Sequence, residues 1–169
     1  EDLPSAVANA CRFGGEALVE RYVKGREITV GLLGGEVLGS CEVAFGADLF
    51  DYDVKYHTGA HYFVPPRLSE TRLRNVEALA LAAYQALGCR GYARVDLIAS
   101  DSENDVLLEL NTLPGMTPMS LLPKIAAHRG MSFEDLVEQI LALAALEEVE
   151  VSAAETSSTP ILTRSRHAG

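Results

Sequence analysis

Two segments in the middle of the chain alternate between polar and apolar residues. They are residues 94–97, Arg-Val-Asp-Leu, and residues 108–111, Leu-Glu-Leu-Asn. A period of two residues is typical of a β-strand with one buried face, so Leu108 and Leu110 are expected on the buried side. The polar segment 101–105 between them predicts a turn, and the two strands are therefore expected to pair antiparallel as a hairpin.

A hairpin that is symmetric about this turn places four polar side chains on one face, with Asp96 opposite Glu109 and Arg94 opposite Asn111. Carboxylate and amide oxygens are suitable ligands for Mg²⁺, which typically binds through one or two carboxylates together with substrate phosphates. An adjacent arginine suits a phosphate group or a developing oxyanion. The hairpin alone is equally compatible with an ordinary solvated polar face.

The segment that follows the second strand favours a binding site. Asn111-Thr-Leu-Pro-Gly115 ends in a Pro-Gly turn, and Ser120-Leu-Leu-Pro123 predicts the start of a helix, with Ser120 as its cap and a proline in its first turn. Glycine lets the backbone approach a ligand closely, and a helix N-terminus attracts anions. This part of the chain therefore predicts an anion site.

Further elements are predicted before the hairpin. Residues 4–13 are rich in alanine and predict a helix that Gly14-Gly15 ends. A strand is expected to begin at Ala17 and to run to Val23. Two more strands, with Gly34-Gly35 as the turn between them, are expected at residues 27–33 and 36–43.

Three later helices follow from periods near 3.6 residues. The first runs from Ser69 to about Leu87 and is stopped by Gly88. The second spans residues 121–129, and the third starts at Ser132-Phe-Glu-Asp135. The residues expected inward on the first helix are Leu73, Val76, Ala80, Ala83, Tyr84 and Leu87, and those on the third are Leu136, Ile140, Leu143 and Ala144.

Composition narrows the class of protein. A chain of 169 residues with 48% hydrophobic content is suited to one domain with a core. Its formal net charge of −10 argues against nucleic acid and anionic membranes as partners, and nucleotide binding would depend on local cations. No apolar run is long enough to span a bilayer. An odd number of cysteines, three, favours a reducing cytoplasm.

Two segments show no clear period. Residues 45–70 are too long for an ordinary connection, and loops of this length are usually functional lids or disordered. Their aromatic content argues against plain disorder. Residues 147–169 are acidic, then rich in Ser and Thr, then basic, and we interpret them as a disordered tail after a domain at residues 1–146.

The hairpin and the segment after it carry a resemblance to a known family. Glu109-x-Asn-Thr-x-Pro-Gly-Met-Thr117, followed by Ser120-Leu121 and preceded by Gly91-x-x-Arg-x-Asp96, closely resembles the D-alanine–D-alanine ligases of the ATP-grasp superfamily. The resemblance runs from about Leu18 to about Ala145. Glu-x-Asn alone is shared by many ATP-grasp enzymes, whereas the longer string is specific to the D-alanine ligase group.

The resemblance implies an α+β fold, the C-terminal domain of an ATP-grasp enzyme. Such a domain has a mostly antiparallel sheet flanked by helices and is expected here to be incomplete at its N-terminus. The family's ligases are longer, and this chain begins at Glu1-Asp-Leu-Pro4 without an initiator methionine. We therefore expect it to be the C-terminal portion of a larger protein and to be inactive by itself.

The resemblance also assigns the nucleotide contacts. Glu20, Tyr22 and the backbone of Val23 match the family's adenine pocket, and Glu27 would accept from the ribose hydroxyls. From the residues alone, Glu20 and Glu27 would be solvated charges at strand ends.

A mobile loop over the phosphates is matched by residues 50–56. There, Lys55 would act on the transferring phosphoryl group, and Tyr56 would close the substrate site. Phe50 stands where close relatives often have a tyrosine, so a hydroxyl contact would be lost.

Catalytic roles follow in the same way. Asp96, Glu109 and Asn111 would hold two Mg²⁺ ions, or Mn²⁺, with Glu109 bridging them. Arg94 and the backbone N–H of Gly115 would form an oxyanion hole. For the second D-alanine, the carboxylate would be bound by Ser120 and Leu121.

The activity implied by the resemblance is ATP-dependent joining of two D-alanines through an acyl phosphate, for peptidoglycan precursors. Such an enzyme would be cytoplasmic and, at full length, a homodimer. Two alternatives remain open. One is a related ligase that joins D-alanine to D-lactate or D-serine, and the other is a non-catalytic remnant that binds nucleotide or a partner.

Overall fold

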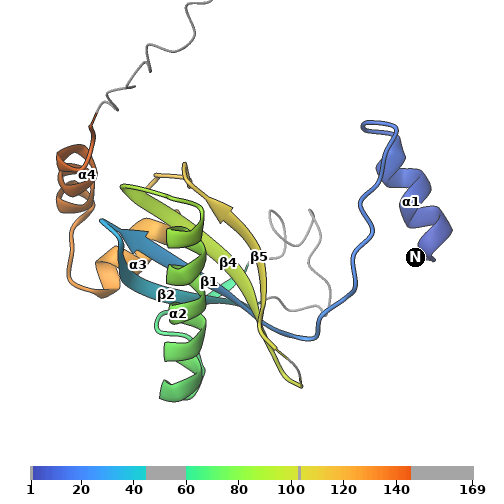
Figure 1. The fold of residues 1–169 in the computed structure, drawn as a ribbon, viewed down its shortest axis with the longest axis horizontal. Coiled ribbons are helices and arrows are strands. Elements are labelled where there is room, and N and C mark those ends of the chain that lie inside the picture. Colours follow the sequence, from blue (N-terminus) through green and yellow to red (C-terminus); the bar gives the residue numbers. More distant parts are fainter. Residues whose placement is uncertain (1, 45–59, 103, 146–169) are drawn as a thin grey trace, which may run out of the picture.

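The computed structural model of the chain describes residues 2–44, 60–102 and 104–145 (Figure 1). Its sheet has five strands in the order β3-β2-β1-β4-β5, and every neighbouring pair is antiparallel. The strands are β1 (Gly25–Leu33), β2 (Glu36–Ala44), β3 (His61–Phe63), β4 (Tyr92–Ser100) and β5 (Val106–Asn111). The helices are α1 (Leu3–Cys11), α2 (Glu70–Ala86), α3 (Leu121–His128) and α4 (Phe133–Ala142).

Helix α2 covers one face of the sheet (Figure 1). Because side chains alternate along a strand, β1 and β4 turn every second residue toward this helix. The main hydrophobic core forms there from Ile28, Val30, Leu32, Val76, Ala80, Tyr84, Ala93, Val95, Leu97 and Ala99. The polar residues of β4 therefore lie on the opposite face of the sheet.

Helices α3 and α4 pack over part of that opposite face. Their cluster consists of Leu33, Leu38, Cys41, Leu122, Ile125, Ala126 and Leu136. Helix α3 lies directly over β1 because Gly31 has no side chain, and a Cβ there would stand 2.7 Å from Leu122 Cδ1. Burial raises the pKa of the Cys41 thiol to about 11, although the nearby charge of Lys124 lowers it.

Several predicted turns and caps are confirmed. Gly34 and Gly35 form the β1–β2 turn with φ of 62° and 83°, which are angles that favour glycine. Helix α2 starts at the cap Ser69, whose side chain accepts from the Arg72 backbone N–H. Helix α4 starts with a capping box between Ser132 and Asp135.

Other predictions are wrong. Residues 17–23 form no strand, because this segment lies apart from the sheet and no described strand is beside it to supply hydrogen bonds (Figure 1). Leu108 is 52% exposed, since a bulge in β5 turns Leu107 into the core in its place. Leu87 and Leu143 are also exposed because each follows the last full turn of its helix.

The long segment expected to be irregular contains a short strand. β3 pairs with β2 through Glu42↔Phe63, Val43↔Tyr62 and Ala44↔His61. Residues 45–59 and the expected tail lie outside the described residues. Among the residues that the structure does describe, no helix has both the length and the apolar character needed to cross a membrane.

A buried carboxylate connects β2 to the segment after β3. Glu42 is 2% exposed and accepts from Arg67 Nη2 at 2.7 Å, from the Arg67 backbone N–H at 2.9 Å and from Arg26 Nη1 at 3.4 Å. Burial raises the pKa of Glu42, but these hydrogen bonds and the two positive charges outweigh it and hold the pKa below its ordinary value. Arg67 also lies over the ring of Phe63, 3.7 Å from its centroid.

Candidate functional site

The hairpin register predicted from the sequence is confirmed. Asp96 pairs with Glu109 and Arg94 pairs with Asn111, and the bulge begins only beyond Asp96. All four side chains therefore share the face of the sheet that lies away from α2. Helices α3 and α4 pack over the β1–β2 side of this face, and among the described residues the Glu109 side chain on the β4–β5 side is 60% exposed.

Arg94 joins the two carboxylates. Its Nε and Nη2 donate to Asp96 Oδ2 at 3.0 and 2.8 Å, and Nη2 also donates to Glu109 Oε1 at 3.3 Å. The Asp96 side chain is only 10% exposed, whereas that of Glu109 is 60% exposed. One guanidinium against two carboxylates leaves a local excess of negative charge, which suits a cation.

Thr29 is a member of this cluster that the sequence reasoning missed. It is 1% exposed on β1, directly beside Asp96, and its hydroxyl donates to Asp96 Oδ1 at 2.7 Å. The signal available in the sequence was a hydroxyl between Ile28 and Val30 in an apolar strand, on the same face as Glu27. A threonine is too common in strands for that signal to stand out.

The loop after β5 brings Gly115 against the start of α3. A Cβ on Gly115 would stand 3.1 Å from Ser120 Oγ. Ser120 occupies the predicted cap position, but its side chain makes no capping hydrogen bond. Its hydroxyl instead bonds to the Thr117 backbone N–H at 3.1 Å and to the Thr117 hydroxyl at 3.0 Å. The prediction of Ser120 as the cap of this helix is confirmed, and its hydroxyl bonds to Thr117 instead of to a backbone N–H of the helix.

Leu121 is the first residue of α3 and packs against the smaller core cluster. Lys124 follows in the same helix, and its ammonium group donates to the Met119 backbone oxygen and lies over the ring of Tyr62. These contacts hold the segment just before Ser120 against the sheet. The start of α3 is thereby fixed relative to β3.

The donor set fits a hard divalent cation. Asp96, Glu109 and Asn111 offer only oxygen atoms, as Mg²⁺ prefers. Asn111 Oδ1 already accepts from the Leu113 backbone N–H at 3.0 Å, and a carbonyl oxygen has a second lone pair. No group of three or more His, Cys, Asp and Glu suited to a metal ion occurs in the described part of the chain. Any ion here would depend on the Asn111 amide and on ligands such as phosphate or water.

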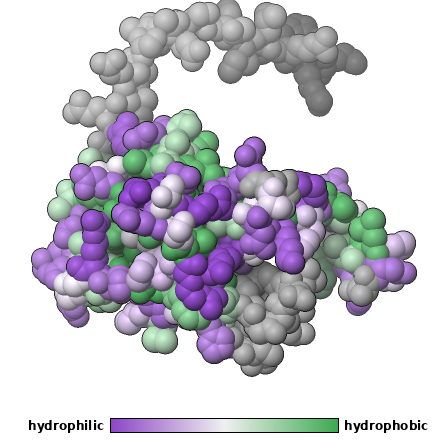
Figure 2. Space-filling view, turned by 90° about the horizontal axis from the view of Figure 1, so that it is seen from below, coloured by the Kyte–Doolittle hydropathy of each residue, from purple (hydrophilic) through white to green (hydrophobic). Residues whose placement is uncertain are grey.

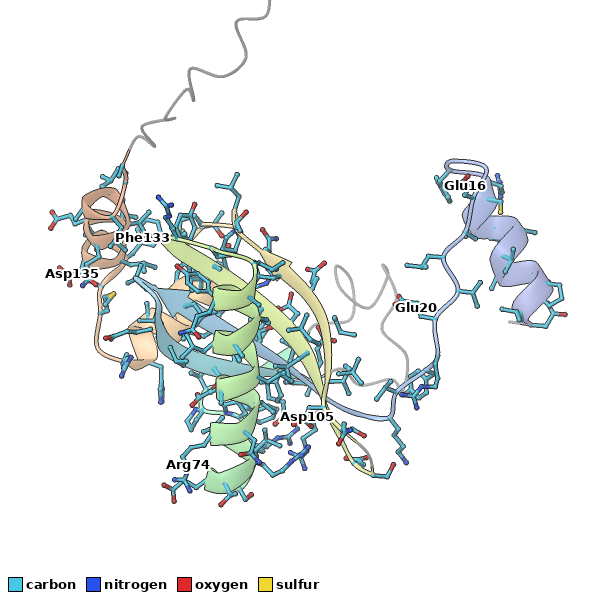
Figure 3. All side chains as sticks on the ribbon, viewed as in Figure 1. Glu16, Glu20, Arg74, Asp105, Phe133 and Asp135 are labelled. Atoms are coloured by element: carbon cyan, nitrogen blue, oxygen red, sulfur yellow. The ribbon has the colours of Figure 1, made fainter. Side chains whose placement is uncertain are left out.

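The residues assigned to the nucleotide are not all brought to the hairpin. Glu27 is half-buried on β1, on the same face as Thr29 and Asp96. Glu20 and Tyr22 are exposed and Val23 is half-buried in the segment between α1 and β1, and Figure 3 shows Glu20 well away from the sheet.

Lys55, Tyr56 and Phe50 lie outside the described residues.

The N-terminal part of the chain presents apolar surface. Helix α1 has no buried residue, and it stands apart from the sheet in Figure 1. Hydrophobic surface gathers at this end of the molecule in Figure 2. The exposed large side chains of this part are Leu3, Phe13, Leu18, Val19 and Tyr22.

Comparisons with known proteins show which family the chain is similar to. The model of a family described as the D-ala D-ala ligase C-terminus matches residues 1–142, beginning earlier than the Leu18 expected from the motifs. The chain is 46% identical over 149 residues to the D-alanine–D-alanine ligases of Trichlorobacter lovleyi and of Geobacter sulfurreducens. These alignments cover 87% of this chain and 48% and 47% of those proteins, so the chain spans about half the length of the curated relatives it matches.

Solved structures give the same picture. The D-alanine–D-alanine ligase of Bacillus anthracis complexed with ATP superposes with a TM-score of 0.70 at 32% identity, covering 83% of this chain and 45% of that one. The VanG D-Ala:D-Ser ligase of Enterococcus faecalis superposes with a TM-score of 0.72 at 30% identity, covering 83% of this chain and 42% of that one. The α+β fold expected from the sequence, an antiparallel sheet flanked by helices, is confirmed.

Proposed function

The chain belongs to the D-alanine–D-alanine ligase family of ATP-grasp enzymes, and from this premise we propose that it carries the ATP, Mg²⁺ and second-substrate sites for joining two D-alanines. The observation that supports the proposal best is the hairpin face, where Arg94, Asp96 and Glu109 are in contact beside Asn111. The product, D-alanyl-D-alanine, would serve peptidoglycan precursor synthesis.

The reaction needs two steps. A carboxylate oxygen of the first D-alanine attacks the γ-phosphorus of ATP, and ADP leaves with the electrons of the broken P–O bond. The amine of the second D-alanine then attacks the acyl carbon of the resulting acyl phosphate, and its nitrogen loses a proton. The tetrahedral intermediate collapses, the C–O bond to phosphate breaks, and the dipeptide forms.

Asp96, Glu109 and Asn111 are the proposed ligands of two Mg²⁺ ions, with Glu109 between them. When bound, Mg²⁺ would neutralise charge that develops on the transferring phosphoryl group. The Glu109 side chain is 60% exposed, so it would be accessible to an ion from solvent. The buried Asp96 is suited to a fixed single position.

Arg94 and the backbone N–H of Gly115 are proposed to stabilise the oxyanion of the tetrahedral intermediate. Ser120 and Leu121 are proposed to bind the carboxylate of the second D-alanine at the start of α3, where backbone N–H groups and the helix dipole favour an anion. The contact between Gly115 and Ser120 supports this division, since it brings the two proposed sites together.

Glu20, Tyr22 and Val23 are proposed to bind adenine and Glu27 to bind the ribose. Lys55 and Tyr56 are proposed to act at the phosphates and at the substrate. These assignments depend on the family resemblance. The cytoplasmic location and the homodimer are proposed on the same basis, whereas the domain at residues 1–146 with a tail at 147–169 is proposed from composition.

The decisive experiment measures ADP release and dipeptide formation by the protein in its native length. D-alanine-dependent ADP release with formation of D-alanyl-D-alanine is expected, detected by a coupled assay and by mass spectrometry. Failure to form any D-alanine product would refute the proposal.

A substrate panel separates the alternatives. D-lactate and D-serine are offered in place of the second D-alanine, and a clear preference for either would favour the related ligases, one of which is the VanG D-Ala:D-Ser ligase. Magnesium-dependent ATP binding without turnover on any of the three substrates would favour a non-catalytic remnant.

A further inference from the structure

Thr29 makes the shortest hydrogen bond to the proposed cation ligand Asp96. The two side chains are direct neighbours across β1 and β4, and the Thr29 hydroxyl donates to Asp96 Oδ1 at 2.7 Å. Both residues are buried, at 1% and 7% exposure. A buried hydroxyl without a partner is costly, and so is a buried carboxylate, so each of the two groups stabilises the other.

Thr29 places a hydroxyl at a fully buried position of the sheet. Thr29 lies in the central strand, and its neighbours Ile28 and Val30 are completely buried hydrophobic residues. Valine has the same branched shape as threonine and is ordinarily preferred at a fully buried strand position. The hydroxyl therefore has its use in the contact with Asp96.

Among the described residues, Arg94 and Thr29 both donate hydrogen bonds to the Asp96 carboxylate. Arg94 takes Oδ2 with two N–H groups, and Thr29 takes Oδ1 with one hydroxyl. An ionised carboxylate has about four acceptor positions, so one on Oδ1 is left for a further partner. Thr29 restricts the direction of that position by fixing the carboxylate from the side of β1.

The two donors differ in charge. Arg94 neutralises part of the negative charge that would attract a cation, and the proposed function also gives it another partner, the oxyanion. Thr29 is neutral, so it can orient Asp96 without reducing the attraction. A neutral donor from a rigid central strand is the kind of partner that orients metal-binding carboxylates in proteins.

We propose that Thr29 is a positioning residue that holds Asp96 in the orientation in which it binds a divalent cation. This inference depends on the proposed function, because it takes Asp96 to be a cation ligand.

The test compares Thr29→Val, which keeps the shape and removes the hydroxyl, with Thr29→Ser, which keeps the hydroxyl. Mn²⁺ binding is measured by electron paramagnetic resonance on the native-length protein in the presence of a non-hydrolysable ATP analogue. Thr29→Val is expected to weaken Mn²⁺ binding by roughly 10- to 100-fold, the usual effect of losing such a partner. Thr29→Ser is expected to stay close to the original affinity.

A second readout separates positioning from general damage. In Thr29→Val, the Mg²⁺ concentration for half-maximal turnover should rise, and saturating Mg²⁺ should restore most of kcat. Thr71→Val, on an exposed position of α2, is the matched control and should change neither value. If Thr29→Val does not fold, as judged by thermal unfolding, Thr29→Ala replaces it, because alanine also lacks the hydroxyl.

Asp96→Asn tests the role of Asp96 as a cation ligand separately from the positioning role of Thr29. If Asp96→Asn leaves Mn²⁺ binding unchanged, the proposed ligand assignment fails. If Asp96→Asn weakens binding and Thr29→Val does not, the role of Thr29 is overturned and the ligand assignment stands. Weak Mn²⁺ binding in Thr29→Ser as well as Thr29→Val would also overturn it, since the hydroxyl would then not be the cause.

Discussion

Arg94 takes part in both the proposed cation site and the proposed oxyanion site. In the structure, its guanidinium bonds to both carboxylates, whereas the proposed reaction needs it near the tetrahedral intermediate. Cation binding to Glu109 would compete with Arg94 for the Glu109 carboxylate oxygen Oε1. Such an exchange of partners would release one of its N–H groups for the oxyanion.

Replacing Arg94 by alanine tests this role. Losing one oxyanion donor typically costs roughly 10²- to 10³-fold in turnover, so Arg94→Ala should lower kcat at least that far, and Asp96→Asn further. Steady-state ADP release by the native-length protein measures both. Arg74→Ala, which removes an exposed arginine of α2 paired with Glu70, is the control and should leave kcat unchanged. Turnover near the original value in Arg94→Ala would contradict the assignment.

Single site residues could be predicted from the sequence where several of them belong to one alternating pattern. Asp96, Glu109 and Asn111 followed from two alternating segments, and the polar turn between them set their register. Thr29 did not, because one hydroxyl in an apolar strand has no pattern of its own. The cap at Ser120 was predicted from residue type alone, which could not show that Thr117 would take its hydroxyl.

At the scale of elements, one ion-pair cluster joins β2 to the segment after β3. Glu42 has a lower pKa in the folded chain than in the unfolded chain, because Arg67 and Arg26 outweigh the effect of its burial. As pH falls, the unfolded chain therefore takes up the proton first. The stabilisation from Glu42 is complete above its ordinary pKa of 4.5 and is lost as pH falls through the lower folded value.

Glu42→Gln tests this cluster. Hydrogen bonds to a charged group usually contribute about 1.5–3 kcal/mol. At neutral pH we expect the change to lower the free energy of unfolding by the lower part of that range, because Arg67 is half-exposed. The difference from the original protein should shrink below pH 4.5. Urea unfolding at several pH values measures it. Glu70→Gln, at an 83% exposed position, should show no such trend, and a constant difference for Glu42→Gln would refute the account.

The close packing of α3 on β1 gives another prediction at this scale. In Gly31→Ala the new Cβ would meet Leu122 Cδ1 at 2.7 Å, and overpacking of this kind typically costs about 1–3 kcal/mol. Because α3 begins at the proposed carboxylate site, the KM for the second D-alanine should rise as well. Urea unfolding and substrate titration measure the two effects. Gly14→Ala, with open space around it, is the control, and unchanged stability in Gly31→Ala would contradict the packing argument.

Elements with a partner nearby in the sequence were predictable, and those that depend on distant partners were not. The β1–β2 and β4–β5 hairpins and helices α2 and α4 carry their own turns and caps. The expected strand at residues 17–23 failed because a strand also needs a neighbour, which residue pattern alone cannot supply. β3 was missed because three residues are too few to show a period.

At the scale of the whole molecule, the negative net charge affects the proposed binding of ATP. A net charge of −10 repels free ATP, and only local cations can offset this. Mg²⁺ complexed to ATP removes two negative charges from the ligand before it arrives. The charge of these 169 residues would therefore make the proposed nucleotide binding depend on the metal.

Metal removal tests that dependence. ATP binding to the native-length protein, measured by calorimetry, should weaken by at least about tenfold when EDTA replaces Mg²⁺, which corresponds to about 1.4 kcal/mol. Ionic strength is held constant with KCl, so that screening does not change between the two conditions. Equal ATP affinity with and without Mg²⁺ would show that the proposed ligands do not take part in nucleotide binding.

The strand order places the proposed ligands on supports of unequal stiffness. Asp96 and Thr29 belong to strands with neighbours on both sides, whereas Glu109 and Asn111 belong to β5, which is the edge of the sheet. Asp96 and Thr29 are therefore expected to be held more rigidly than Glu109 and Asn111, whose strand can adjust when a ligand binds. Amide hydrogen exchange is expected to be slower in β4 than in β5, with the larger slowing on Mg²⁺ and nucleotide binding in β5. Ligand binding would then order the edge strand β5, while the centre of the sheet would keep the same conformation with and without ligand.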